Sequence, residues 1–196
     1  GRNGKTVVKE WLYQLLSPEK NVTRSPRSYN SQIGVPLSVW NLDERSEVGL
    51  FEAGISEPGE MEALQSVIQP TIGVFTCLGD AHQENFTSYE QKCLEKLKLF
   101  KDAKVLVYDM DDARVVGCVN RSAFKGEYFA WSRQRRDVPL YIASVEKREA
   151  ETVVSYIYKG KEAACSIPFI DEASLANSVS CLAVCLHLGM SPETIA

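Results

Sequence analysis

The first predicted helix lies near the start of the chain, where apolar residues repeat every three or four positions. These residues are Val7, Val8, Trp11, Leu12, Leu15 and Leu16. The spacing is that of one face of a helix, and Ser17-Pro18 marks its end. We therefore expect the chain to open with a helix that stops near residue 16.

Strand-like and helical segments then alternate. We expect strands near residue 22 and over residues 48–53, 71–78 and 105–108, and helices over residues 35–42, 60–68 and 89–100. Alternation of this kind is typical of a parallel sheet with helices on both faces.

The pattern changes in the last third of the chain. Short strand-like segments follow one another at residues 128–131, 140–145, 153–157 and 163–167, with no helical segment between them. They predict a small antiparallel meander over about residues 127–170. A last helix is expected over residues 175–188, and Gly189 marks its end, since helices often end at a glycine. The predicted fold class is α/β, with a mainly parallel sheet of phosphate-loop type and an antiparallel meander on one flank.

Composition narrows the function classes. The chain has 196 residues, 44% of them hydrophobic, and a net charge of -4, which suits one globular domain and gives no basic footprint for nucleic acid. The longest apolar run, residues 181–186, is far shorter than the roughly 20 residues that cross a bilayer. We expect a cytoplasmic protein with no membrane insertion and with a small-molecule partner.

The six cysteines show no C-x-x-C spacing, and we expect them to be reduced and mostly buried. Cys181 and Cys185 lie one helical turn apart in an apolar stretch, which favours packing over a metal pair.

The residues Gly1-Arg2-Asn3-Gly4-Lys5-Thr6 form most of a phosphate-binding loop. In such a loop, backbone N–H groups at a helix N-terminus hold phosphates, the lysine reaches the outer phosphates, and the hydroxyl binds Mg²⁺. A plain helix cap is the alternative interpretation. The loop also requires a strand before it, so we expect the domain to include a strand upstream of Gly1.

Further polar side chains follow the predicted strands. Glu52 ends one strand, and Asp80 and His82 follow the next, so all three are expected at the carboxyl edge of the sheet, where ligands of parallel sheets bind. Structural roles as a strand-end acid or a core histidine stay open for Glu52 and His82. Lys96 borders the apolar stripe of its predicted helix, where neighbouring lysines also suit a solvated basic face.

Taken together, these motifs resemble the central ATP-binding domain of the Mur ligases. The segments that carry the resemblance, in order, are residues 1–6, 29–36, 52–54, 79–82, 96–100 and Asn177 in the last helix. The resemblance covers nearly the whole chain, residues 1–196, and implies that a UDP-sugar domain and a C-terminal domain flank it in a longer protein.

The resemblance also implies an activity. It points most closely to the ligase of peptidoglycan precursor synthesis that joins D-Ala-D-Ala to UDP-N-acetylmuramoyl-tripeptide through an acyl phosphate. Residues 24–40 resemble the form of that ligase that is fused to an alanine racemase, a pyridoxal phosphate enzyme.

Site roles carried over from the family rest on the matching motifs alone. ATP would be held by Gly1, Arg2, Asn3, Gly4, Lys5, Thr6, Asn30 and Asn177. Two Mg²⁺ ions would be held by Thr6, Glu52, His82 and Lys96. Lys96 matches the family's carbamylated lysine, in which added CO₂ turns a cation into an oxygen ligand. Lys5, Lys96 and His82 would be the catalytic residues.

Several positions depart from the family pattern: Val7, Ser31, Cys77 and Ala173-Ser174. They leave open which substrate is used and how adenine is bound. Two alternatives therefore stand beside the proposed ligase. One is another ligase of the same superfamily, such as a folylpolyglutamate synthase, and the other is a nucleotide-binding module without turnover. A GTPase fits less well because the N-K-x-D guanine motif is missing.

Overall fold

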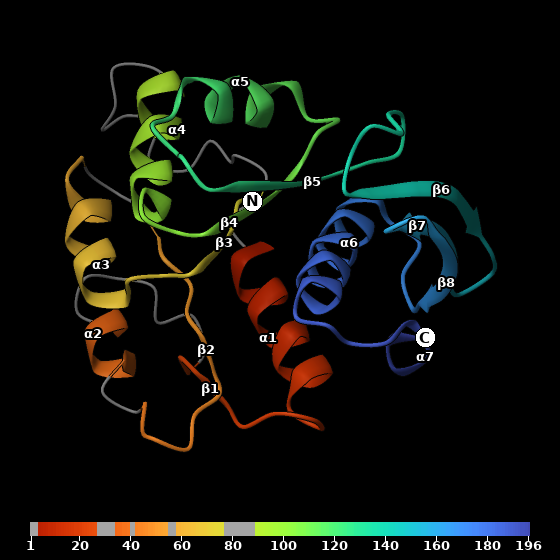
Figure 1. Cartoon of the computed structure of the whole chain (residues 1–196), viewed down its shortest axis with the longest axis horizontal. Coiled ribbons are helices and arrows are strands. Elements are labelled where there is room, and N and C mark those ends of the chain that lie inside the picture. The colour runs from red at the N-terminus through yellow and green to blue at the C-terminus, as the bar shows by residue number, and fades with distance from the viewer. Residues whose placement is uncertain (1–3, 27–33, 40–41, 55–57, 77–88) are drawn as a thin grey trace.

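The fold of the chain is a three-layer α/β arrangement, seen in a computed structural model that describes residues 4–26, 34–39, 42–54, 58–76 and 89–196 (Figure 1). The helices are α1 (Gly4–Leu16), α2 (Gly34–Val39), α3 (Glu60–Ile68), α4 (Tyr89–Leu97), the 3₁₀ turn η2 (Lys98–Phe100), α5 (Ala113–Arg121), α6 (Glu172–His187) and α7 (Pro192–Ile195). The strands are β1 (Val22–Arg24), β2 (Val48–Leu50), β3 (Ile72–Val74), β4 (Val105–Asp109), β5 (Glu127–Ser132), β6 (Leu140–Lys147), β7 (Thr152–Tyr158) and β8 (Lys161–Ile167).

The strands form two sheets. Strands β1 and β2 pair in parallel, and a second sheet runs in the order β3-β4-β5-β6-β7-β8. Pairing is parallel from β3 to β6 and antiparallel from β6 to β8. The predicted α/β class with an antiparallel flank is therefore confirmed.

One part of the predicted meander is wrong. Strand β5 was expected to be antiparallel, but it pairs in parallel with both β4 and β6. The helix α5 between β4 and β5, which the sequence reading did not predict, supplies the crossover that parallel neighbours need. Valines and Gly117 give this helix a weak intrinsic propensity, and its N-cap Asp112 compensates by accepting from Arg114 N and Val115 N.

Alternation along β4 separates the two faces of the sheet. Val105 and Val107 belong to the core that contains α1 and α6, whereas Leu106 and Tyr108 belong to the core that contains α4 and α5. Because successive side chains of a strand point to opposite faces, one strand contributes to both cores.

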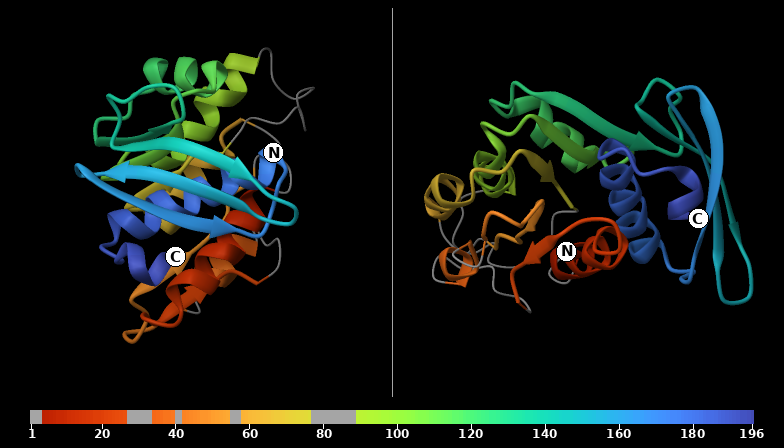
Figure 2. Two further views of the ribbon diagram at one scale, coloured as in Figure 1. Left: turned by 90° about the vertical axis from the view of Figure 1, so that its right-hand side faces the viewer. Right: turned by 60° about the horizontal axis from the view of Figure 1, so that its bottom comes forward.

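Helix α6 lies between the parallel strands and the antiparallel strands β6–β8 (Figures 1 and 2). Its residues from Val179 to Leu186 are all buried, as expected for a helix with packing partners on every side. Cys181 Sγ lies 3.7 Å from Val8 O of α1, and Trp11 stacks on Phe169 with ring centroids 4.9 Å apart. These contacts fix the first helix against the body of the domain.

The cysteines follow the expectation only in part. Cys165, Cys181 and Cys185 are free and buried, and burial raises the pKa of each thiol. Cys93 of α4 and Cys118 of α5 form a disulfide, with Cα atoms 5.9 Å apart, so the prediction of reduced cysteines is wrong for this pair. Cys77 lies outside the described residues. None of the described helices has the length and apolar character needed to span a membrane.

Candidate functional site

The candidate site lies where the N-terminus of α1 meets the carboxyl ends of β1 and β2. Helix α1 begins at Gly4, so Lys5 and Thr6 occupy its first turn. The first N–H groups of a helix have no partner within the helix and carry partial positive charge, so this end suits an anion such as phosphate.

Thr6 and Glu52 contact each other directly across 46 residues of sequence. Thr6 Oγ1 lies 3.0 Å from Oε1 and 2.7 Å from Oε2 of Glu52, and donates to this carboxylate. The Glu52 side chain is only 1% exposed. The hydroxyl and the carboxylate therefore lie in direct contact beside the strand end, while their predicted part in binding a metal stays a prediction.

The same two side chains fit a Mg²⁺ ion. Mg²⁺ binds oxygens at about 2.0–2.1 Å in octahedral geometry, which places neighbouring ligand oxygens about 3 Å apart. The Thr6–Glu52 oxygen separations already match this spacing. No group of three or more His, Cys, Asp or Glu side chains is close enough to hold a metal among the described residues. Phosphate oxygens and water usually complete the coordination of Mg²⁺ in such sites.

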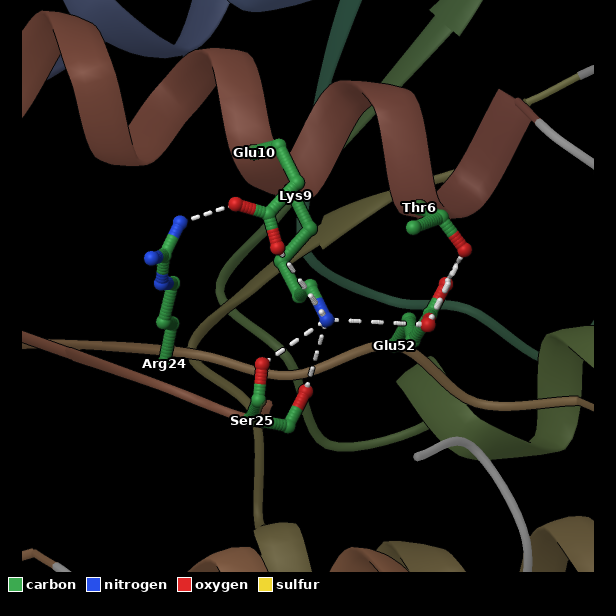
Figure 3. A network of polar contacts seen from close by, with 6 residues as sticks. All are labelled: Thr6, Lys9, Glu10, Arg24, Ser25 and Glu52. Carbon is green, nitrogen blue, oxygen red and sulfur yellow. Dashed lines mark hydrogen bonds and ion pairs between the residues drawn. The ribbon is translucent and has the colours of Figure 1, made fainter. Parts of the chain in front are cut away.

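A buried lysine, Lys9, lies next to the Thr6–Glu52 pair (Figure 3). Lys9 Nζ lies 2.8 Å from the carbonyl oxygen of Ser25, 3.3 Å from Ser25 Oγ and 3.6 Å from Glu52 Oε1. It is also 3.7 Å from Glu10 Oε1, and Glu10 in turn pairs with Arg24. The network joins α1 to the ends of β1 and β2.

A cavity of about 400 Å³ opens beside the site, between β2 and β3. Lys5, Glu52 and Lys96 all line it, together with apolar side chains of α1 that include Leu12 and Leu16. The structure thus brings three of the predicted site residues to one cavity.

The remaining described site residues lie on two other helices. Lys96 is half-buried in the last turn of α4. Asn177 of α6 lies against the start of α1, since a Cβ atom on Gly4 would stand 3.4 Å from Asn177 Oδ1. Their predicted roles toward the metal and the nucleotide stay predictions. Gly1, Arg2, Asn3, Asn30 and His82 lie outside the described residues, so their predicted roles stay predictions.

The carboxyl ends of β4 and β5 form a second polar region. Asp111 accepts hydrogen bonds from Ser132 Oγ and, at 2.7 Å, from Arg133 N, which ties the loop after β5 to the end of β4. Arg133 also pairs with Glu172 at the start of α6, 2.9 Å away. These contacts tie the ends of β4 and β5 to the start of α6.

Asp109 in this region makes a testable contribution to stability. Burial raises the pKa of its carboxyl to about 6 from 3.8, although the bond from Asp111 N opposes the rise. The folded protein therefore binds more protons than the unfolded chain between about pH 4 and 6, and stability falls as the pH rises through this window. We expect Asp109→Asn to raise the free energy of unfolding by about 1 kcal/mol at pH 7.5, discounted for partial exposure, and to have almost no effect at pH 4.

Urea denaturation at the two pH values checks this expectation. Glu149→Gln is the matched control, because Glu149 is an exposed carboxylate on the turn between β6 and β7, and its replacement should change the free energy of unfolding by less than about 0.5 kcal/mol at either pH. A stabilisation by Asp109→Asn of equal size at both pH values would contradict the assignment.

Sequence reasoning missed Lys9 and Ser25. A signal was present for Lys9, because it shares one helix face with Leu12 and Leu16, at spacings of three and seven residues. A lysine inside an apolar stripe must find buried partners, but the pattern does not identify them. Ser25 carries no such signal, since its carbonyl oxygen is the main acceptor.

An α/β sheet with a Gly-Lys-Thr segment at the start of its first helix, and a carboxylate on the neighbouring strand end, defines a nucleotide-binding domain of the phosphate-loop class. Within this class, the chain belongs to the Mur ligase middle domain family, whose family model matches residues 1–185.

Individual relatives agree with the family. The UDP-N-acetylmuramoyl-tripeptide–D-alanyl-D-alanine ligase of Borreliella burgdorferi is 29% identical over 201 residues, covering 100% of this chain and 42% of the relative. The crystal structure of MurF from Acinetobacter baumannii matches 97% of this chain and 42% of that chain with a TM-score of 0.85 at 20% identity. MurF from Thermotoga maritima in complex with ADP matches 98% of this chain and 45% of that chain with a TM-score of 0.82 at 24% identity. The chain thus spans less than half the length of these relatives.

Proposed function

We propose that this chain is the ATP-binding part of a ligase that joins D-Ala-D-Ala to UDP-N-acetylmuramoyl-tripeptide in peptidoglycan precursor synthesis. The observation that carries the proposal is the Thr6–Glu52 contact at the N-terminus of α1, beside Lys5, in a member of the Mur ligase middle domain family. The two substrates in this proposal are those in the name of the B. burgdorferi relative.

In the proposed reaction, ATP phosphorylates the terminal carboxylate of the tripeptide, and the amine of D-Ala-D-Ala then displaces phosphate from the acyl phosphate. Charge on the transferring phosphoryl oxygens is stabilised by positioned cations, so catalysis is largely placement and electrostatics. Lys5 would contact the outer phosphates, and the first turn of α1 would donate backbone N–H groups to them. Thr6 and Glu52 would hold Mg²⁺, which neutralises phosphate charge when bound.

A second group of residues is proposed for the other side of the phosphates. Lys96 in carbamylated form and His82 would hold a second Mg²⁺, and Asn30 would lie near the phosphates. Asn177 would contact the nucleotide on its adenine side, which its place against Gly4 supports. The position of Lys96 on the same cavity as Lys5 and Glu52 supports its part in the set.

We also propose that further parts of the same protein complete this domain. A parallel strand from upstream of Gly1 would lie in the cavity between β2 and β3, where the edges of the two sheets face each other across apolar side chains. The UDP-sugar domain, the C-terminal domain and, if fused, the alanine racemase would lie outside the 196 residues.

Phosphate release by the full-length protein tests the ligase. We expect release with ATP and Mg²⁺ only when both UDP-N-acetylmuramoyl-tripeptide and D-Ala-D-Ala are present, and mass spectrometry should show the joined product. Glu52→Gln should lower this rate by at least about 100-fold, because it removes a charged ligand of the metal. The 196-residue chain alone should be inactive.

The rival functions give different results in the same assay. A folylpolyglutamate synthase would release phosphate with a folate and glutamate in place of the two peptidoglycan substrates. A module without turnover would bind ADP and Mg²⁺ but release no phosphate with either substrate pair.

A further inference from the structure

Lys9 is a charged residue enclosed among apolar and carboxylate groups. Its side chain is 3% exposed, and it stands on the same face of α1 as Leu12 and Leu16. Moving an ammonium group out of water is costly unless nearby groups of opposite charge and hydrogen-bond acceptors compensate. The groups around Lys9 should therefore indicate which negative charge its ammonium compensates.

Four described contacts of Lys9 are of two kinds. The Ser25 carbonyl oxygen and hydroxyl lie at 2.8 and 3.3 Å and act as hydrogen-bond acceptors. Glu52 and Glu10 lie at 3.6 and 3.7 Å and act as charge partners.

The charges of the six residues drawn in Figure 3 balance one another. Lys9 and Arg24 carry two positive charges, and Glu10 and Glu52 carry two negative ones. Glu10 also pairs with the more exposed Arg24, whereas the carboxylate of Glu52 is 1% exposed. Glu52 also accepts a hydrogen bond from the uncharged Thr6 hydroxyl.

We propose that Lys9 is the internal counter-ion of Glu52 and sets how tightly the site binds a divalent cation. The inference rests on the proposed function, in which Glu52 and Thr6 hold Mg²⁺. Lys9 acts through Glu52 and is a positioning residue that touches no substrate.

The expected direction of its effect follows from charge. The ammonium stabilises the Glu52 carboxylate before a cation binds, and it repels a cation that binds on the other side of that carboxylate. Removing the positive charge should therefore strengthen Mg²⁺ binding. Damage to packing would weaken it, so the sign separates a counter-ion from a structural residue.

The experiment measures Mg²⁺ affinity by calorimetry in the full-length protein saturated with ADP. Lys9→Met and Lys9→Gln both remove the charge, and Gln keeps a donor for the Ser25 carbonyl. We expect each to bind Mg²⁺ roughly tenfold more tightly than the unchanged protein, given the strength of charge interactions at this spacing. Lys104→Met is the matched control, because Lys104 is exposed, and its Mg²⁺ affinity should stay within twofold.

Loss of a buried ion pair can prevent folding, so a third variant is needed in case Lys9→Met and Lys9→Gln do not fold. Lys9→Arg keeps the charge and should keep the Mg²⁺ affinity within threefold of the unchanged protein. Unchanged or weaker Mg²⁺ binding by folded Lys9→Met or Lys9→Gln would overturn the proposal, as would a tenfold change in Lys9→Arg.

A double-mutant cycle separates this inference from the proposed function. In a Glu52→Gln background, Lys9→Met should no longer strengthen Mg²⁺ binding, because the two charges act together. An effect of the same size in that background would overturn the role of Lys9. If Glu52→Gln by itself left Mg²⁺ affinity unchanged, the proposed metal site at Glu52 would fail instead.

Discussion

Replacing Lys96 by alanine in the full-length protein should lower ligase turnover by at least about 100-fold, the usual size of an effect on a group that stabilises transition-state charge. Lys96 lies in the last turn of α4 and lines the cavity that Lys5 and Glu52 also line. In carbamylated form it would supply oxygen ligands to a hard metal ion, which an unmodified ammonium cannot do.

Chemical rescue distinguishes this role from a structural one. Acetate or another short carboxylic acid should restore part of the Lys96→Ala activity, since a free carboxylate can occupy the space left by the side chain and bind the metal. Phosphate release at increasing acetate concentration measures the effect. Lys101→Ala, at an exposed position just beyond η2, should retain activity within twofold and show no rescue. A Lys96→Ala protein with an unchanged rate, or one that no carboxylic acid restores, would contradict the carbamate.

The parts of the fold that the sequence predicted are those with local, periodic signals. Helix α3 was expected over residues 60–68 and is found at Glu60–Ile68, and strand β4 differs from its expected range by one residue. Strand β5 shows the limit of such signals. Its residues predict a strand, but the direction of that strand depends on whether a helix connects it to β4. The helix propensity of the α5 residues is weak, so the sequence pattern did not predict this helix.

The candidate site shows the same division. Thr6 was predicted from the motif of the phosphate-binding loop, and Glu52 because ligands of parallel sheets bind at the carboxyl ends of the strands, which is a property of topology. Lys9 was missed because its role depends on the distances from one flexible side chain to Ser25 and Glu52. Periodicity shows that a lysine is buried, but only packing shows which carboxylate it faces.

The cavity between β2 and β3 leads to the second large prediction, which concerns stability. In the described part of the chain these strands are edges of the two sheets. The space of about 400 Å³ between them is lined by apolar side chains of α1, β2 and β3, and Lys5, Glu52 and Lys96 line it as well. A strand that enters it would pair with both edges and bury its own side chains. Each buried Val, Leu or Ile contributes about 1.5–3 kcal/mol, against an ordering cost of about 1–2 kcal/mol per residue.

We therefore expect the chain extended upstream by its native residues to be more stable than the 196-residue chain by at least about 2 kcal/mol, a rise of about 4–8 °C in Tm for a domain of this size. Thermal unfolding followed by circular dichroism measures the difference, and binding of a hydrophobic dye should fall as the cavity fills. The matched control carries the same upstream residues in scrambled order, because it keeps their composition but loses the alternation that a strand needs. If the scrambled extension stabilised the chain as much as the native one, the gain would come from added length or charge, and the cavity would not be the place of a strand.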